Sequence, residues 1–260
     1  MHAQDPGVKT AIDGLTARGA LALRDAISPS RLTTYLARAH RNVRLALELY
    51  EWNVRTGAAL YPILQTNEVT LRNAVERALS SQFGGVWPYA PGFLRSLPGR
   101  DRAAFEACVR RVERTLGVAR AATGDVVATQ TYWFWVNLLT SRFEQRIWSR
   151  EFGRAFPFAP RGVDRAIVHR QADSLRRLRN RIAHHEPLLD VDVGGAYRRA
   201  AAMVRWISPE KAAWAESRWP LERGLQGRAG STPLVRARVV PYPSPAGANP
   251  PTLPPPCPAS

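Results

Sequence analysis

The sequence has little cysteine, almost no lysine and no long apolar run. Cys108 and Cys257 are the two cysteines among 260 residues, too few for a cysteine zinc cage and unfavourable for a structural disulfide. The longest apolar stretch, from Tyr132 to Leu139, is too short to cross a bilayer, and the N-terminus lacks the apolar segment of a secretory signal. We therefore expect a cytoplasmic protein with no membrane partner.

Positive charge, in contrast, is abundant and almost entirely arginine. The formal net charge is +16 at pH 7, and Lys9 and Lys211 are the only lysines among 37 basic residues. Such a chain attracts polyanions, most commonly nucleic acid, and guanidinium groups favour bidentate contacts with phosphate. A genome rich in G and C produces the same excess of arginine, so composition alone leaves open whether the chain binds RNA.

Apolar spacing predicts an all-α fold, a bundle of several helices without strands. Apolar residues recur at helical intervals from about Arg41 to Ser81, where Pro62 is expected to kink or divide the helix. The aromatic segment from Asp125 to Phe152 is expected to be helical and to form core rather than to stack on bases. Further helices are expected after the Ser28 cap, from Asp101 to Leu116, from Gly162 to Glu186, and near 194–207 and 210–218.

The chain divides by composition into three parts. Residues 1–27 carry scattered apolar positions and are expected to form a short or poorly packed helical N-terminal segment. Residues 28–219 hold the helical patterns of one domain. From Pro220 to Ser260 the chain holds eleven of its 21 prolines, which predicts a disordered tail, with the short run Val235–Val240 as its one weak strand candidate.

The most informative string is SLRRLRNRIAHHEPLL, residues 174–189, at the end of an expected helix. At 100° per residue, Leu175, Leu178 and Ile182 form a buried stripe, and Asn180 and His184 lie one turn apart on the opposite face. Arg179 lies beside Asn180. Arg177 and Arg181 border His184, whereas His185 falls nearer the buried stripe.

This grouping of Arg, Asn and His suits metal-independent cleavage of RNA by its own 2′-hydroxyl. His184 would transfer the proton, because an imidazole titrates near neutral pH. Arg179 would stabilise the charge that develops on the phosphate, and Asn180 would orient the phosphate or the imidazole. The reaction benefits from both a base and an acid, and a symmetric homodimer would supply two histidines.

Other functions fit the same residues. An arginine followed at short spacing by a histidine arises easily by chance in a chain this rich in arginine. The face would then be a non-catalytic module that binds RNA or a partner protein, or a solvated surface of a helical interaction protein. A metal site is disfavoured because the adjacent His184 and His185 lack the i,i+4 spacing of helical metal ligands, and no cofactor is indicated.

The segment LRNRIAHHEPLL, residues 178–189, resembles the Abi-like abortive-infection proteins, which belong to the HEPN superfamily of helical nucleases. Two further segments, LYEWNVRTGAALYPILQTNEVTLRNAVERAL (49–79) and FWVNLLTSRFEQRIW (134–148), are similar to the same family, so the resemblance spans most of residues 28–190.

The resemblance implies a HEPN-like helical bundle that acts as a homodimeric, metal-independent endoribonuclease. Its role would be in phage defence or as a toxin, with RNA as substrate and an antitoxin or regulatory protein as a further partner. Arg179, Asn180 and His184 would be catalytic. The supporting candidates are His185, Arg177, Arg181, Glu68, Arg72 and Asn73, of which Glu68 and Arg72 are also spaced for an i,i+4 ion pair.

Overall fold

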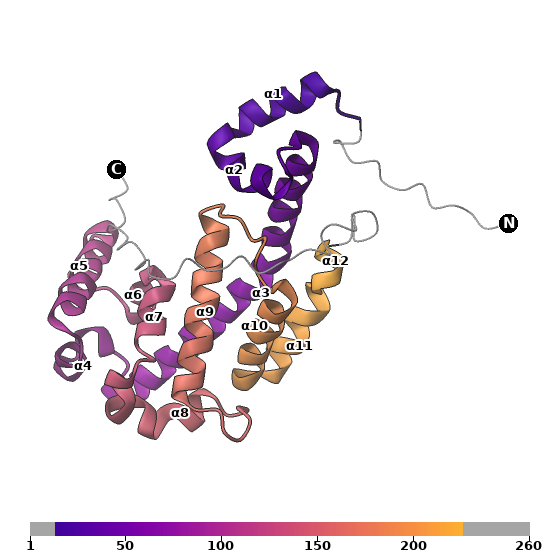
Figure 1. The fold of residues 1–260 in the computed structure, drawn as a ribbon. Coiled ribbons are helices and arrows are strands. Elements are labelled where there is room, and N and C mark those ends of the chain that lie inside the picture. The colour runs from indigo at the N-terminus through magenta and orange to yellow at the C-terminus, as the bar shows by residue number, and fades with distance from the viewer. Residues whose placement is uncertain (1–13, 226–260) are drawn as a thin grey trace.

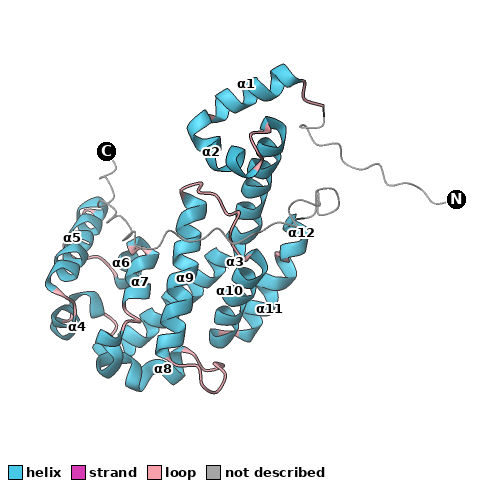
Figure 2. Cartoon of the chain, viewed as in Figure 1, coloured by secondary structure: helices cyan, strands magenta, loops and turns pink. Residues whose placement is uncertain are grey.

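The computed structural model describes residues 14–225, and all the regular structure within them is helical, as the sequence predicts (Figures 1 and 2). The α-helices are α1 (Ala17–Ile27), α2 (Pro29–Arg38), α3 (Val43–Phe83), α4 (Pro91–Ser96), α5 (Gly99–Leu116), α6 (Thr123–Thr129), α7 (Tyr132–Asn137), α8 (Ser149–Ala155), α9 (Arg165–Ala183), α10 (Val193–Ile207), α11 (Pro209–Arg218) and α12 (Leu221–Leu225). Three short turns complete them, the 3₁₀ turns η1 (Trp87–Tyr89) and η2 (Ser141–Phe143) and the π-helical turn η3 (Glu144–Trp148).

Helix α3 is the scaffold of the molecule, because α1, α2, α7, α8, α9, α10, α11 and α12 all pack against it (Figure 1). It begins at an Asn42 cap, whose side chain accepts a hydrogen bond from the Leu45 amide, and it ends before Gly84. Pro62 does not divide it, contrary to one of the outcomes expected from the sequence. The proline deprives the Ala58 carbonyl of its helical donor, but Ala58 is exposed, so water can take that place.

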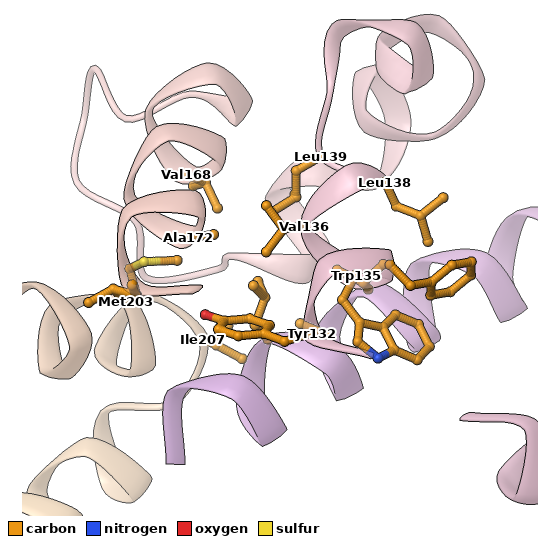
Figure 3. Packing of buried hydrophobic residues seen from close by; sticks show 14 of the residues in the cluster. Tyr132, Trp135, Val136, Leu138, Leu139, Val168, Ala172, Met203 and Ile207 are labelled. Atoms are coloured by element: carbon orange, nitrogen blue, oxygen red, sulfur yellow. The ribbon is translucent and has the colours of Figure 1, made fainter. Parts of the chain in front are cut away.

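Two clusters of buried side chains hold the helices together. The smaller cluster joins α1, α2 and the start of α3 through residues that include Leu32, Tyr35 and Leu47. The larger cluster surrounds the rest of α3. Figure 3 shows part of it, where Tyr132 of α7 lies among apolar side chains of α9 and α10.

The aromatic segment is core, as predicted, but it is not one helix. It is broken into α6, α7, η2, η3 and α8, with Thr131 capping α7 by accepting a hydrogen bond from the Phe134 amide. Tyr132, Phe134 and Trp135 are buried, while Trp133 is exposed. Polar residues that look tolerable within a helix, such as Thr131 and Thr140, instead mark the breaks because their short side chains bond to nearby backbone.

Most other predicted boundaries agree with the structure. Ser28 caps α2 by accepting from the Arg31 amide, as predicted. Asp101 is not a cap, because α5 begins after Pro98 and the Asp101 carboxylate instead accepts a hydrogen bond from Asn137. Within the tail predicted from residue 220 onward, α12 is helical and Leu221 is buried.

The remainder of that tail, including the strand candidate Val235–Val240, lies outside the described residues. Within residues 14–225, no helix is both long and apolar enough to cross a membrane.

A buried amide joins three helices at the centre of the fold. Asn67 of α3 accepts a hydrogen bond of 2.7 Å from the Tyr132 hydroxyl of α7, and its own amide donates to the Ala200 carbonyl of α10 at 3.3 Å. Burial is the main cause that raises the pKa of Tyr132 above its ordinary range, so this hydroxyl keeps its proton and remains a donor.

Replacing Tyr132 with Phe should therefore destabilise the fold by about 1–3 kcal/mol, because it leaves a buried amide oxygen without its donor. The free energy of unfolding in urea measures this loss. Tyr61→Phe is the matched control, since that tyrosine is 50% exposed, and it should change stability by less than about 0.5 kcal/mol. Equal effects of the two substitutions would contradict the bridging role of Asn67.

Candidate active site

Helix α9 carries the candidate residues to its C-terminal end. It begins at Asp164, whose side chain accepts a hydrogen bond of 2.8 Å from the Ile167 amide, and it buries Val168, Leu175 and Leu178 as the sequence predicts. The predicted end at Glu186 is three residues too late. His184 is the C-cap, and its amide donates to the Asn180 carbonyl at 2.9 Å.

Asn180 and His184 share one side of this helix end. The backbone of His184, with φ of −90° and ψ of 7°, continues the turn closely enough to leave the two residues one turn apart on the same face. The Arg179 Nη1 atom lies 3.5 Å from the Asn180 Oδ1 atom. Of the three predicted catalytic residues, the structure therefore brings Arg179 and Asn180 into contact, and His184 follows at the C-cap with its side chain exposed.

The helical position predicted for His185 is wrong. Helical spacing put it near the buried stripe, yet it is exposed. Its φ of 57° turns the chain out of the helix, so the helical angle no longer applies beyond His184.

The loop after α9 is held against α3 by a side chain that the sequence analysis did not identify. The buried Asn53 accepts a hydrogen bond of 2.6 Å from the Leu188 amide and donates to the Glu186 carbonyl at 3.5 Å. Ile182 packs over Gly57, where an added Cβ would lie 3.4 Å from Ile182 Cγ2. Asn53 could have been identified from the sequence, because it is a polar residue on the apolar stripe of α3.

Arg179 forms an ion pair with Glu68 of α3, with 3.2 Å between Nε and the carboxylate oxygen. The Glu68 side chain is 22% exposed. Burial raises the pKa of Glu68 above its ordinary value, and the attraction of Arg179 and Arg72 offsets this only in part. The two arginines therefore do not fully compensate the cost of burying the charged form of Glu68.

The other supporting candidates are arranged around this pair. Glu68 pairs with Arg179, and Arg72 instead donates through Nε to Asn73 at 3.3 Å. Arg177 pairs with Asp173 at 2.5 Å, and Arg181 lies 3.6 Å from Glu186 while also donating to the Pro187 carbonyl.

These ion pairs do not prevent the arginines from binding phosphate. Arg177 and Arg181 are 64% and 38% exposed, and pairs of that kind contribute only about 0–1 kcal/mol. A phosphate oxygen can therefore replace the carboxylate at little cost in free energy.

A cavity of about 190 Å³ opens beside the Glu68–Arg179 pair. It is lined by five residues, four from α3 and one from α9, namely Tyr61, Gln65, Glu68, Val69 and Arg179. Tyr61 and Gln65 were not identified from the sequence. Their spacing was the available signal, because Tyr61, Gln65, Glu68 and Arg72 fall on one face of a helix.

Comparison with known proteins gives no match to a family model, a curated protein or a solved structure. Among residues 14–225, no group of three or more His, Cys, Asp or Glu side chains is placed to hold a metal ion.

Glu68→Gln should leave the protein as stable as the original chain or more stable at pH 7. A carboxyl whose pKa is raised by folding stabilises the fold below its unfolded pKa, and that contribution is lost as the pH rises through the folded pKa. The gain in stability from Glu68→Gln should therefore increase with pH between about pH 4 and pH 7, as measured by urea unfolding.

The control for this prediction is Glu51→Gln, which removes the more exposed pair with Arg55 and should change stability little. Arg179→Ala should destabilise the chain, since it leaves Glu68 half-buried and unpaired, and adding Glu68→Gln should restore the loss. A loss of stability from Glu68→Gln that grows with pH would contradict this account.

Proposed function

We propose that this protein is a metal-independent endoribonuclease whose active site is the C-terminal end of α9. The observation that carries the proposal is the presence of a guanidinium, an amide and an imidazole at one helix end, where Arg179 contacts Asn180 and the exposed His184 lies one turn beyond Asn180. The resemblance of residues 178–189 to the Abi-like proteins of the HEPN superfamily supports the same assignment, and with it a HEPN-like arrangement of the helices.

The proposed reaction is an in-line transfer within the RNA strand. The ribose 2′-oxygen bonds to the adjacent phosphorus and gives up its proton to an imidazole. The bond from phosphorus to the 5′-oxygen then breaks, and that oxygen takes a proton as it leaves. The products are a 2′,3′-cyclic phosphate and a 5′-hydroxyl.

Arg179 is suited to stabilise the charge on the phosphate in this reaction. A guanidinium has five N–H donors, more than the contacts of Arg179 with Glu68 and Asn180 require. Because Glu68 contacts Nε, it fixes the orientation of the guanidinium plane while leaving donors at the outer nitrogens. The Asn180 amide, whose Oδ1 atom lies 3.5 Å from Arg179 Nη1, would orient the phosphate or the imidazole.

One helix end offers one well-placed imidazole, whereas the reaction uses a base and an acid. We therefore propose a homodimer in which two α9 ends meet and each contributes its His184. Phage defence or toxicity, with control by an antitoxin or another regulatory protein, is the role that the family resemblance implies for such an enzyme.

A non-catalytic RNA-binding module is the second candidate. It is favoured by the exposed Arg177 and the partly exposed Arg179 and Arg181 near the end of α9, which would bind phosphate without any contribution from His184. Such a protein binds RNA in a salt-dependent way and leaves it intact.

His184→Ala should reduce RNA cleavage in the presence of EDTA by at least about 100-fold, the usual contribution of general acid–base catalysis. Arg179→Lys should also reduce it strongly, because a lysine keeps the charge but loses the fork of donors. His185→Ala is the matched control and should retain most activity. Cleavage rates and the chemistry of the product ends measure this. Intact RNA with every variant, despite salt-sensitive binding, would favour the second candidate.

The dimer makes a separate prediction. Adding an excess of the inactive His184→Ala chain to the original chain should inhibit cleavage, because mixed dimers hold one imidazole where two are needed. Light scattering should give a mass of two chains at the same concentrations. Undiminished activity after subunit exchange, or a mass of one chain, would contradict the paired site.

A further inference from the structure

We propose that the cavity beside Arg179 binds one unpaired RNA base, the base of a nucleotide adjacent to the phosphate that Arg179 contacts. This proposal rests on the proposed function and assigns the substrate class as single-stranded RNA. Its central residues are Tyr61 and Gln65, to which neither the sequence motif nor the proposed reaction gives a role.

The size and lining of the cavity fit a single base. At about 190 Å³ it is smaller than the roughly 300–1,000 Å³ of pockets that hold drug-sized ligands, so it admits one ring system. Val69 supplies an apolar wall, and the Tyr61 ring, which is 50% exposed, supplies a surface for stacking. Bases that are free of pairing bind proteins largely by stacking on aromatic side chains.

Gln65 supplies the group that reads the edge of the base. Its side chain is exposed at the cavity and carries both a hydrogen-bond donor and an acceptor, which match the paired donors and acceptors on the edges of bases. Within a duplex, base pairing occupies the edges of the bases and stacking covers their faces, so the cavity favours bases in loops and single strands.

Positively charged side chains beside the cavity would position the sugar-phosphate backbone of the RNA. Arg179 lies on one side of the cavity, and Arg72 follows Glu68 by one turn on the same face of α3. Further along, Lys211 of α11 is close enough to Arg72 and Arg77 for their repulsion to add to burial in lowering its pKa. An RNA strand that leaves the cavity along α3 therefore meets the positive charges of Arg72, Arg77 and Lys211.

The experiment measures binding of short RNAs in the His184→Ala background, so that cleavage does not consume the probe. Five-nucleotide RNAs, each with an abasic nucleotide at one position, are compared by fluorescence anisotropy. One abasic position should weaken binding about tenfold, which corresponds to loss of one stacked base. Adding Tyr61→Ala should weaken binding of the intact RNA by a similar factor and abolish the sensitivity to that abasic position.

Matched variants separate stacking from general damage. Tyr61→Phe keeps the ring and should retain affinity, and Trp133→Ala removes an aromatic side chain of similar exposure, 48%, on α7 and should have no effect. RNAs that differ only in the base at the sensitive position should bind the original chain with different affinities. Gln65→Ala should make these affinities more alike. Gln145 is also exposed, and Gln145→Ala should leave the difference unchanged. Light scattering on Tyr61→Ala checks that the mass is unchanged.

Each outcome distinguishes the pocket from the proposed reaction. If the original chain cleaves RNA but Tyr61→Ala does not change RNA binding, the proposed base pocket is wrong and the proposed nuclease activity is retained. Binding that depends on Tyr61 and on one base, without cleavage under any condition, supports the pocket and overturns the nuclease. A change of mass in Tyr61→Ala, or equal weakening by Trp133→Ala, also overturns the pocket.

Discussion

The C-terminal end of α9 is fixed against α3 by one buried amide, that of Asn53, and the candidate site depends on this attachment. Asn53 satisfies the Leu188 amide, a backbone group that would otherwise be costly to bury, and also donates to the Glu186 carbonyl. The chain can therefore leave the helix at His184, turn at His185 and return along α3. Together with the Arg179–Glu68 ion pair and the packing of Ile182 over Gly57, this attachment holds the end of α9 beside the cavity.

Electrostatics at the site combine a half-buried carboxylate with an arginine that retains spare donors. The burial of Glu68 raises its pKa, and Arg179 recovers only part of that cost. This arrangement suits a group that must bind an anion, because the guanidinium is oriented by a partner that a phosphate can displace or share. In the proposed enzyme, the same side chain would link base binding at Tyr61 to the chemistry at His184.

The fold class and the helix faces were predictable because apolar spacing is a strong local signal. The stripe of α9 and the long helix α3 follow from it directly. The breaks in the aromatic segment were not predictable, since Thr131 and Thr140 act through local capping that competes with a continuous helix. Tyr61, Gln65 and Asn53 were missed for another reason. Their roles arise where α3 meets α9 and the loop after it, between residues more than 100 positions apart in the chain.

The most direct test of the central claim compares two oligonucleotides in EDTA, an RNA with a mapped cleavage site and its counterpart with a 2′-deoxy sugar at that one position. The RNA should be cut to leave a 2′,3′-cyclic phosphate, and the substituted strand should bind equally well but stay intact at that position. Cleavage of both strands at the same site, or of neither, would contradict the claim that the end of α9 uses the ribose hydroxyl to cut RNA.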